Sequence, residues 1–158
     1  QRISGFEPSV LFFDPIIEKS DLPNTTKARD LAEIFSTCDI ITIHTPLLPQ
    51  TKGMITRELL SMMKKDAILI NAARGGIVDE EALYDILKDK KIRCAGFDVF
   101  ATEPLPANSK LLELTNLIMS PHVGASTEEA QFRVGEMAVH QIKEFFINNN
   151  LLNEVKAK

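Results

Sequence analysis

Three polar side chains with complementary chemistry each lie just past the end of an apolar run. They are Arg74, Glu103 and His122. Arginine can hold a carboxylate through two parallel hydrogen bonds and polarise a carbonyl beside it. Histidine gives and takes a proton near neutral pH, and a carboxylate next to the imidazole fixes its tautomer and favours its protonated form. This combination suits the reduction of a 2-keto acid with hydride from a bound nicotinamide, a reaction that requires no metal.

Arg74 lies in a glycine turn, Asn71-Ala-Ala-Arg-Gly-Gly-Ile-Val-Asp79, between an apolar run and an amphipathic run. This is the pattern of a strand, a tight turn and a helix, in which Gly75 and Gly76 let the backbone approach a bound molecule. Ligands of open α/β sheets bind at the carboxyl ends of the strands. We therefore expect Arg74 to face a small anionic substrate. The alternative is an ordinary turn whose arginine pairs with a surface acid.

Two further polar residues end apolar runs nearer the start of the chain. Asp14 follows the run 9–13, where the carboxylate of a nucleotide-binding fold accepts hydrogen bonds from ribose hydroxyls and repels a 2′-phosphate. A turn aspartate before Pro15 is an equally ordinary interpretation. His44 ends the run 39–44 and could serve as an acid or base, although a packed histidine at a strand end explains it as well.

Apolar and amphipathic runs alternate along the chain, which predicts a parallel sheet with helices on both faces. The predicted strands are 9–13, 39–44, 67–70, 94–100 and 117–120, and the predicted helices are 26–37, 56–63, 80–88 and 126–147. Thr56 and Asp79 are expected to cap the helices that follow them, and Ser126 and Glu129 to form a capping box. Right-handed crossovers would bring the carboxyl ends of the strands to one edge of the sheet.

The amino-acid composition limits the classes of protein to which the chain can belong. The chain has 158 residues, 44% of them hydrophobic and 25% charged, which is typical of one globular domain. A net charge of −4 gives no electrostatic reason to expect nucleic acid or an anionic membrane as a partner, and no apolar run approaches the roughly 20 residues of a membrane span. Cys38 and Cys94 are not spaced for metal binding. They are expected to be buried free thiols in a reducing, cytoplasmic setting.

Three longer blocks carry a resemblance to a known family. The blocks are Asn71–Asp79, Asp98-Val-Phe-Ala-Thr-Glu-Pro104 and Ser120-Pro-His-Val-Gly-Ala-Ser-Thr-Glu-Glu-Ala130. In sequence, order and spacing they resemble the signature blocks of the D-isomer-specific 2-hydroxyacid dehydrogenases, and the similarity covers essentially the whole chain. The resemblance implies a Rossmann-like, doubly wound parallel sheet with NAD as cofactor.

Within this family, the segments 13–17, 124–127 and 129–131 are most similar to the D-3-phosphoglycerate dehydrogenase branch, which acts at the entry to serine biosynthesis. The resemblance thus implies an NAD-dependent oxidoreductase of a small 2-hydroxy or 2-keto acid, working as a homodimer or higher homo-oligomer. Glyoxylate, hydroxypyruvate and D-lactate remain open as substrates. A non-catalytic NADH-binding module, like the corepressors related to this family, is the alternative from another class.

The resemblance implies a role for each matching residue. Arg74 would anchor the substrate carboxylate, and His122 would be the general acid/base with Glu103 as its partner. The cofactor positions that it implies are Asp14 at the adenosine ribose, Thr45 and Pro46 at the adenine side, Ala72 and Arg74 along the nicotinamide ribose, and Asp98, His122 and Gly124 at the nicotinamide.

One part of the family pattern is missing. In the family, a strand and a G-x-G-x-x-G loop that binds the pyrophosphate precede the Asp14 strand, and nothing like them stands in this sequence. We expect the missing strand to lie between the Asp14 strand and the strand before Arg74, where each unpaired buried backbone group costs about 1–3 kcal/mol. Since the chain also begins on Gln1 and lacks the family's substrate domain, residues 1–158 are interpreted as a partial NAD-binding domain. Weak NAD affinity and no useful turnover are expected of it alone.

Overall fold

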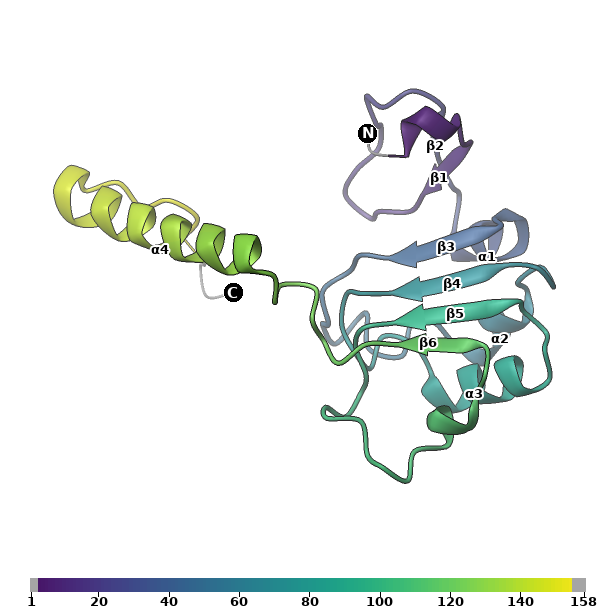
Figure 1. The fold of residues 1–158 in the computed structure, drawn as a ribbon. Helices are drawn as coiled ribbons and strands as arrows, with labels where there is room; N and C mark the ends of the chain where they lie inside the picture. Colours follow the sequence, from purple (N-terminus) through teal and green to yellow (C-terminus); the bar gives the residue numbers. More distant parts are fainter. Residues whose placement is uncertain (1–2, 155–158) are drawn as a thin grey trace. The chain divides into compact units, whose positions relative to one another are not determined.

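Four short strands form a parallel sheet in the order β3-β4-β5-β6. They are β3 (Ile40–Ile43), β4 (Ile68–Asn71), β5 (Cys94–Phe97) and β6 (Leu117–Met119) in the computed structural model, which describes residues 3–154 (Figure 1). Each strand pairs in parallel with its neighbour, so all four carboxyl ends lie along one edge. The predicted Rossmann-like parallel α/β arrangement is confirmed.

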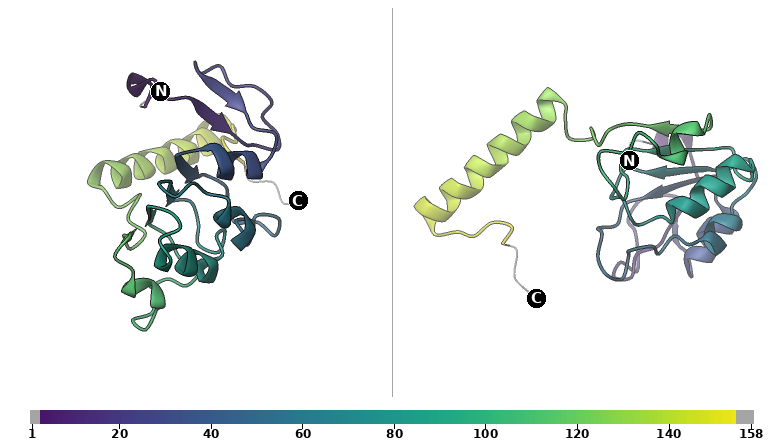
Figure 2. Two further views of the ribbon diagram at one scale, coloured as in Figure 1. Left: turned by 90° about the vertical axis from the view of Figure 1, so that its right-hand side faces the viewer. Right: turned by 90° about the horizontal axis from the view of Figure 1, so that it is seen from below.

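Three helices, which precede β3, β4 and β5 in the chain, pack against one face of this sheet. They are α1 (Leu31–Thr37), α2 (Arg57–Ser61) and α3 (Glu80–Lys88), with a 3₁₀-helix, η2 (Lys110–Glu113), before β6 (Figure 2). Strand residues alternate in burial: Ile41 and Leu69 are buried in the core with the helices, whereas Ile40 and Ile118 are exposed. Within residues 3–121, these three α-helices therefore cover one face of the sheet.

A second, two-stranded parallel sheet pairs β1 (Val10–Phe12) with β2 (Thr25–Lys27). The prediction of a helix over 26–37 is wrong in its first part, because the β-branched Thr25 and Thr26 pair with β1 instead. The helix begins only at Leu31, where the Asp30 carboxylate accepts a hydrogen bond from the backbone N–H of Glu33 at 2.8 Å. Likewise, Thr56 stands at the N-cap position of α2, but its side chain makes no capping bond.

The expected place of an additional strand is also wrong. Strand β4 pairs on one side with β3 and on the other with β5, so no strand can be inserted beside it. The edge strands of the four-stranded sheet are β3 and β6. The sequence pattern does not show which strands are neighbours, because several orders place apolar strands side by side equally well.

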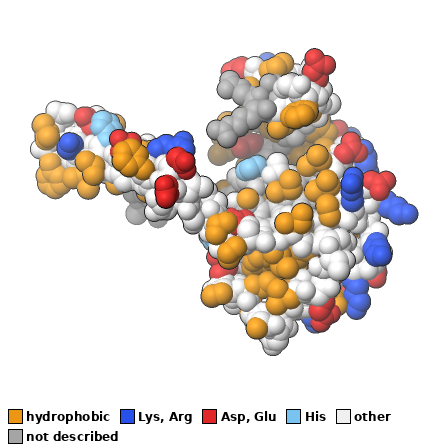
Figure 3. All heavy atoms as spheres, in the orientation of Figure 1, with side chains coloured by type: hydrophobic (Ala, Val, Ile, Leu, Met, Phe, Trp, Pro, Cys, Tyr) orange, Lys and Arg blue, Asp and Glu red, His pale blue; other side chains and the backbone are white. Residues whose placement is uncertain are grey.

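The chain divides into two compact units, with the boundary between Pro121 and His122. The second unit contains α4 (Glu128–Asn148). Its N-cap residue is Thr127, whose hydroxyl accepts a hydrogen bond from the backbone N–H of Ala130, so the cap lies one residue later than the predicted Ser126. Exposed hydrophobic side chains gather along α4, including Phe132 and Phe146 (Figure 3). None of the helices within residues 3–154 has the length and apolarity that a membrane span requires.

Candidate functional site

The turn that carries Arg74 is built by the residue at the end of β4. Asn71 is buried, and its Oδ1 accepts a hydrogen bond from the backbone N–H of Ala73 while its Nδ2 donates to the carbonyl of Arg74, both at 3.1 Å. At the far end of the turn, Asp79 caps α3 by accepting from the N–H of Ala82 at 3.0 Å, as predicted. The turn is therefore fixed at both ends.

Arg74 is exposed at the end of this strand. Its Nη1 donates to the carbonyl of Ala73 at 2.7 Å, and no ion pair within residues 3–154 includes it. The alternative interpretation, an arginine paired with a surface acid, therefore finds no support in the described residues. Most of the guanidinium donors are left for an anion.

Gly75 is where the Arg74 turn touches the loop that follows β5. A Cβ atom at Gly75 would overlap the carbonyl group of Phe100 and lie 2.6 Å from the backbone nitrogen of Ala101. Gly76 has a φ of +76°, a conformation that side chains disfavour. The turn and the loop of Glu103 are thus in direct backbone contact, which only glycine at position 75 permits.

Replacing Gly75 with alanine is expected to lower the free energy of unfolding by about 1–3 kcal/mol, the typical cost of forcing atoms into packed space. The measurement is the urea midpoint and slope of the two proteins. Gly96→Ala is the control, because a Cβ on Gly96 would meet no atom within 4 Å. Equal stability of Gly75→Ala and the parent protein would show that the two loops separate without cost.

Two carboxylates hold the loop that carries Glu103. The N–H of Phe100 donates to Oε1 of Glu103 at 3.0 Å, and the N–H of Ala101 donates to Oε1 of Glu80 at 2.6 Å. The Glu103–Pro104 peptide bond is cis. Glu80 was not among the predicted site residues, because an acid in the first turn of a helix is sufficiently explained by the helix dipole.

Burial raises the pKa of Glu80 above its ordinary value of 4.5; the bond from Ala101 opposes this shift and the nearby charge of Glu103 adds to it. The folded protein therefore holds this proton more tightly than the unfolded chain, so stability falls as pH rises through and above 4.5. Glu80→Gln keeps an oxygen for Ala101 and removes the charge. We expect its stability relative to the parent to increase as the pH rises from 4.5 towards neutrality. Urea midpoints across this range measure the difference, and two parallel curves would contradict the assignment.

Asp98 and His122 follow the ends of β5 and β6. Asp98 is half-buried, and its Oδ1 accepts a hydrogen bond from the Ser120 hydroxyl at 2.6 Å. His122 is exposed and has a φ of +55°, the left-handed region that non-glycine residues adopt with strain, often at functional sites. Arg74 and Glu103 therefore belong to contacting segments of the first unit. His122 belongs to the second, and its pairing with Glu103 remains a prediction.

Some of the predicted cofactor positions carry features that suit a ligand. The Thr45 hydroxyl is buried without a hydrogen-bond partner among the described residues, an arrangement that a bound polar group would satisfy. The Asp14 Oδ1 accepts from the N–H groups of Ile17 and Ile16, which lower the pKa of this carboxyl. Both bonds use Oδ1 and keep Asp14 ionised, so Oδ2 can accept from a ribose. These residues fit a dinucleotide.

The remaining predicted cofactor-binding residues are exposed to solvent. Pro46 and Ala72 are exposed in the loops after β3 and β4, and Gly124 is exposed in the second unit. His44 is exposed as well, with its Nε2 3.0 Å from the Thr42 hydroxyl, so the interpretation of a packed histidine is wrong.

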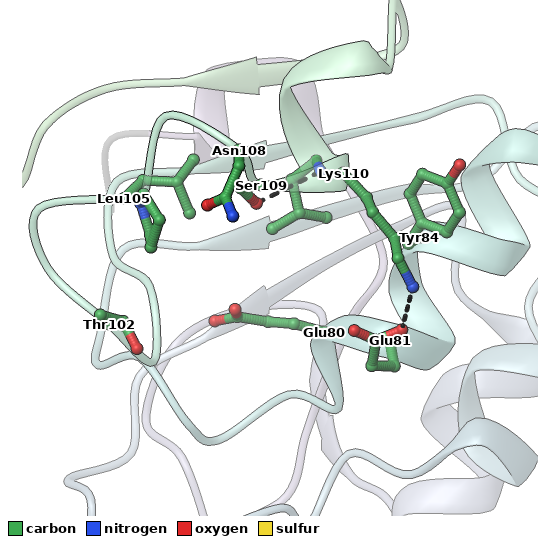
Figure 4. Close-up of a pocket in the computed structure, with 10 residues that line it drawn as sticks. Glu80, Glu81, Tyr84, Thr102, Leu105, Asn108, Ser109 and Lys110 are labelled. Carbon is green, nitrogen blue, oxygen red and sulfur yellow. Dashed lines mark hydrogen bonds and ion pairs between the residues drawn. The ribbon is translucent and has the colours of Figure 1, made fainter.

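A cavity of about 280 Å³ lies between the start of α3 and the loop 102–111 (Figure 4). Lys110 reaches into the same region, where its Nζ lies 3.1 Å from Glu81 and 5.7 Å from the centre of the Tyr84 ring. None of Arg74, Glu103 and His122 lines this cavity. The cavity is therefore part of the packing between α3 and the loop 102–111, and it is separate from the predicted site.

Known proteins resemble this chain over most of its length. The model of the D-isomer specific 2-hydroxyacid dehydrogenase NAD-binding domain matches residues 1–124. The D-3-phosphoglycerate dehydrogenase of Methanocaldococcus jannaschii is 45% identical over 90% of this chain and 28% of its own length, and the hydroxypyruvate reductase of Thermotoga maritima is 42% identical over 90% and 46%.

Among solved structures, the D-lactate dehydrogenase of Lactobacillus jensenii with NAD⁺ superposes with a TM-score of 0.86 at 32% identity, over 100% of this chain and 51% of that one. The chain thus spans from 28% to 51% of the length of these three proteins. The family match covers most of the chain and includes the Arg74 turn and the Glu103 loop. The chain belongs to the D-isomer-specific 2-hydroxyacid dehydrogenases, and its residues 1–124 match their NAD-binding domain.

Proposed function

We propose that this chain is the partial NAD-binding domain of a longer cytoplasmic, homo-oligomeric enzyme that interconverts a small D-2-hydroxy acid and its 2-keto acid. The observation that carries the proposal is the exposed guanidinium of Arg74. It stands at the carboxyl end of an inner strand, makes no ion pair within residues 3–154, and lies on a turn packed against the loop of a candidate acid–base carboxylate. Such a cation is suited to hold a substrate carboxylate.

The proposed substrate is 3-phospho-D-glycerate, with 3-phosphohydroxypyruvate as the keto acid. Support comes from the relatives named D-3-phosphoglycerate dehydrogenase, among them those of Methanocaldococcus jannaschii and Haemophilus influenzae, which are 45% and 41% identical to this chain. Hydroxypyruvate is the second candidate, because the hydroxypyruvate reductase of Thermotoga maritima is 42% identical.

In the proposed mechanism each residue has one task. Arg74 binds the substrate carboxylate with parallel hydrogen bonds and orients the keto group. His122 donates a proton to the keto oxygen during reduction and removes it in the reverse direction, while Glu103 holds the imidazole in the protonated form. Asp98, itself held by Ser120, lies at the end of the neighbouring strand to orient the cofactor ring.

The cofactor contacts follow from the same strand ends. Asp14 would accept from the adenosine ribose, and the hydroxyl of Thr45 would gain its missing partner at the adenine side. Bound NADH supplies the hydride. Because Asp14 is ionised, it would repel the 2′-phosphate of NADPH, so NADH is the expected cofactor.

The test is turnover by the complete protein with NADH and four keto acids: 3-phosphohydroxypyruvate, hydroxypyruvate, glyoxylate and pyruvate. We expect the highest kcat/KM for 3-phosphohydroxypyruvate and a clear preference for NADH over NADPH. A higher value for hydroxypyruvate would select the second candidate. Tight NADH binding without turnover of any 2-keto acid would instead identify a non-catalytic NADH-binding module.

A further inference from the structure

Asn71 is an amide in an otherwise apolar core. Its side chain is on the inward face of β4, the same face as that of Leu69, and only 1% of the residue is exposed. It is the one polar residue that is buried to this degree among residues 3–154. A buried amide persists when its donors and acceptors are paired, so its partners indicate what it does.

Both partners of the Asn71 amide lie in the turn that presents Arg74. Oδ1 accepts from the N–H of Ala73, and Nδ2 donates to the carbonyl of Arg74. The carbonyl of Ala73 in turn accepts from Nη1 of the Arg74 guanidinium at 2.7 Å. One amide thus fixes the backbone on either side of the carbonyl that holds the guanidinium.

The backbone bonds of this turn begin only beyond Gly75, where the carbonyl of Gly76 accepts from the N–H of Gly53 at 2.8 Å. Within residues 3–154, the backbones of Ala73, Arg74 and Gly75 make no hydrogen bond to another backbone group. The backbone carbonyl of Asn71 also accepts from the N–H of Asp98 at 3.0 Å, so the same residue connects the turn to the end of β5.

We propose that Asn71 is a positioning residue whose buried amide sets the place and direction of the Arg74 guanidinium for the substrate carboxylate. This inference rests on the proposed function of Arg74. Without the amide, the turn keeps its glycines but loses the bonds that select one backbone conformation. The guanidinium then meets the substrate in many orientations, and binding weakens.

The test compares four variants with the complete parent protein. Asn71→Leu keeps the number and branching of the side-chain heavy atoms and removes both hydrogen bonds, and Asn71→Ser offers a smaller replacement should the leucine variant not fold. We expect KM for the keto acid to rise and kcat/KM to fall by about 10–100-fold, since a displacement of about 1 Å can cost 100-fold. The Kd for NADH, measured by fluorescence, should be unchanged.

Leu69→Ala is the matched control, because Leu69 is a fully buried neighbour on the same face of β4 but does not contact the turn through hydrogen bonds. It should lower Tm and leave KM unchanged. An Asn71 variant that likewise lowers Tm but keeps the parent KM would overturn the inference and make Asn71 purely structural. Arg74→Ala is measured in parallel to distinguish failure of this inference from failure of the proposed function. An unchanged KM in Arg74→Ala would refute the proposed function itself.

Discussion

Replacing His122 with glutamine is expected to lower kcat of the complete protein by about 10²–10⁴-fold, the usual contribution of a positioned proton donor. Glutamine can still form hydrogen bonds, but it cannot transfer a proton near neutral pH. The measurement is the steady-state oxidation of NADH at saturating keto acid, together with NADH binding by fluorescence, which should persist.

Two further variants isolate proton transfer from other effects. His122→Asn should be equally inactive although asparagine tolerates the left-handed backbone observed at this position, where φ is +55°. His140→Gln, an exposed histidine of α4, should keep the parent rate. Near-normal turnover by His122→Gln would rule out the assigned acid/base.

Replacing Arg74 with alanine is expected to lower kcat/KM by about 10²–10⁴-fold. A hydrogen bond to a charged group contributes about 1.5–3 kcal/mol, two such bonds are lost, and about 1.4 kcal/mol corresponds to tenfold. NADH binding should be spared. The kcat/KM of Arg74→Lys should lie between those of Arg74→Ala and the parent protein, because lysine keeps the charge but lacks the planar pair of donors.

Arg93→Ala is the control for a general loss of positive charge. Arg93 is exposed and immediately precedes β5, so it lies at the opposite edge of the sheet from the strand ends that carry the site. Its removal should leave kcat/KM unchanged. If Arg93→Ala and Arg74→Ala lowered kcat/KM equally, the effect of Arg74 would be one of net charge and not of a specific carboxylate contact.

Local signals predicted part of this structure well. The helix α3 has the predicted bounds, 80–88, because the Asp79 cap and the apolar periodicity both act within a few residues. Strand β2 was missed because its stability comes from pairing with β1, about 15 residues earlier, and not from its own sequence. The place of the additional strand was mistaken for a similar reason, since the neighbours of a strand are determined by contacts remote in sequence.

The candidate site shows the same difference between local signals and contacts that are remote in sequence. Arg74 and Glu103 were predicted because each lies just past an apolar run, and Asp98 was predicted from the resemblance to the family. The supporting residues could not: Glu80 acts on a backbone group 21 residues away. The signal for Asn71 was present, as a single amide at the inward-facing end of an apolar strand, but its two bonds depend on the shape of the turn.

The contact at Gly75 has a consequence for how such a site can diverge. It is made with main-chain atoms of Phe100 and Ala101, so it does not depend on which side chains occupy those two positions. Phe100 is nevertheless buried in the core, whereas Ala101 is exposed. Substitutions at position 101 can therefore change the exposed surface of the loop while the separation of the arginine turn from the carboxylate loop stays constant. The tolerance to variation is thus uneven: Gly75 and the buried Phe100 are constrained, and position 101 is not.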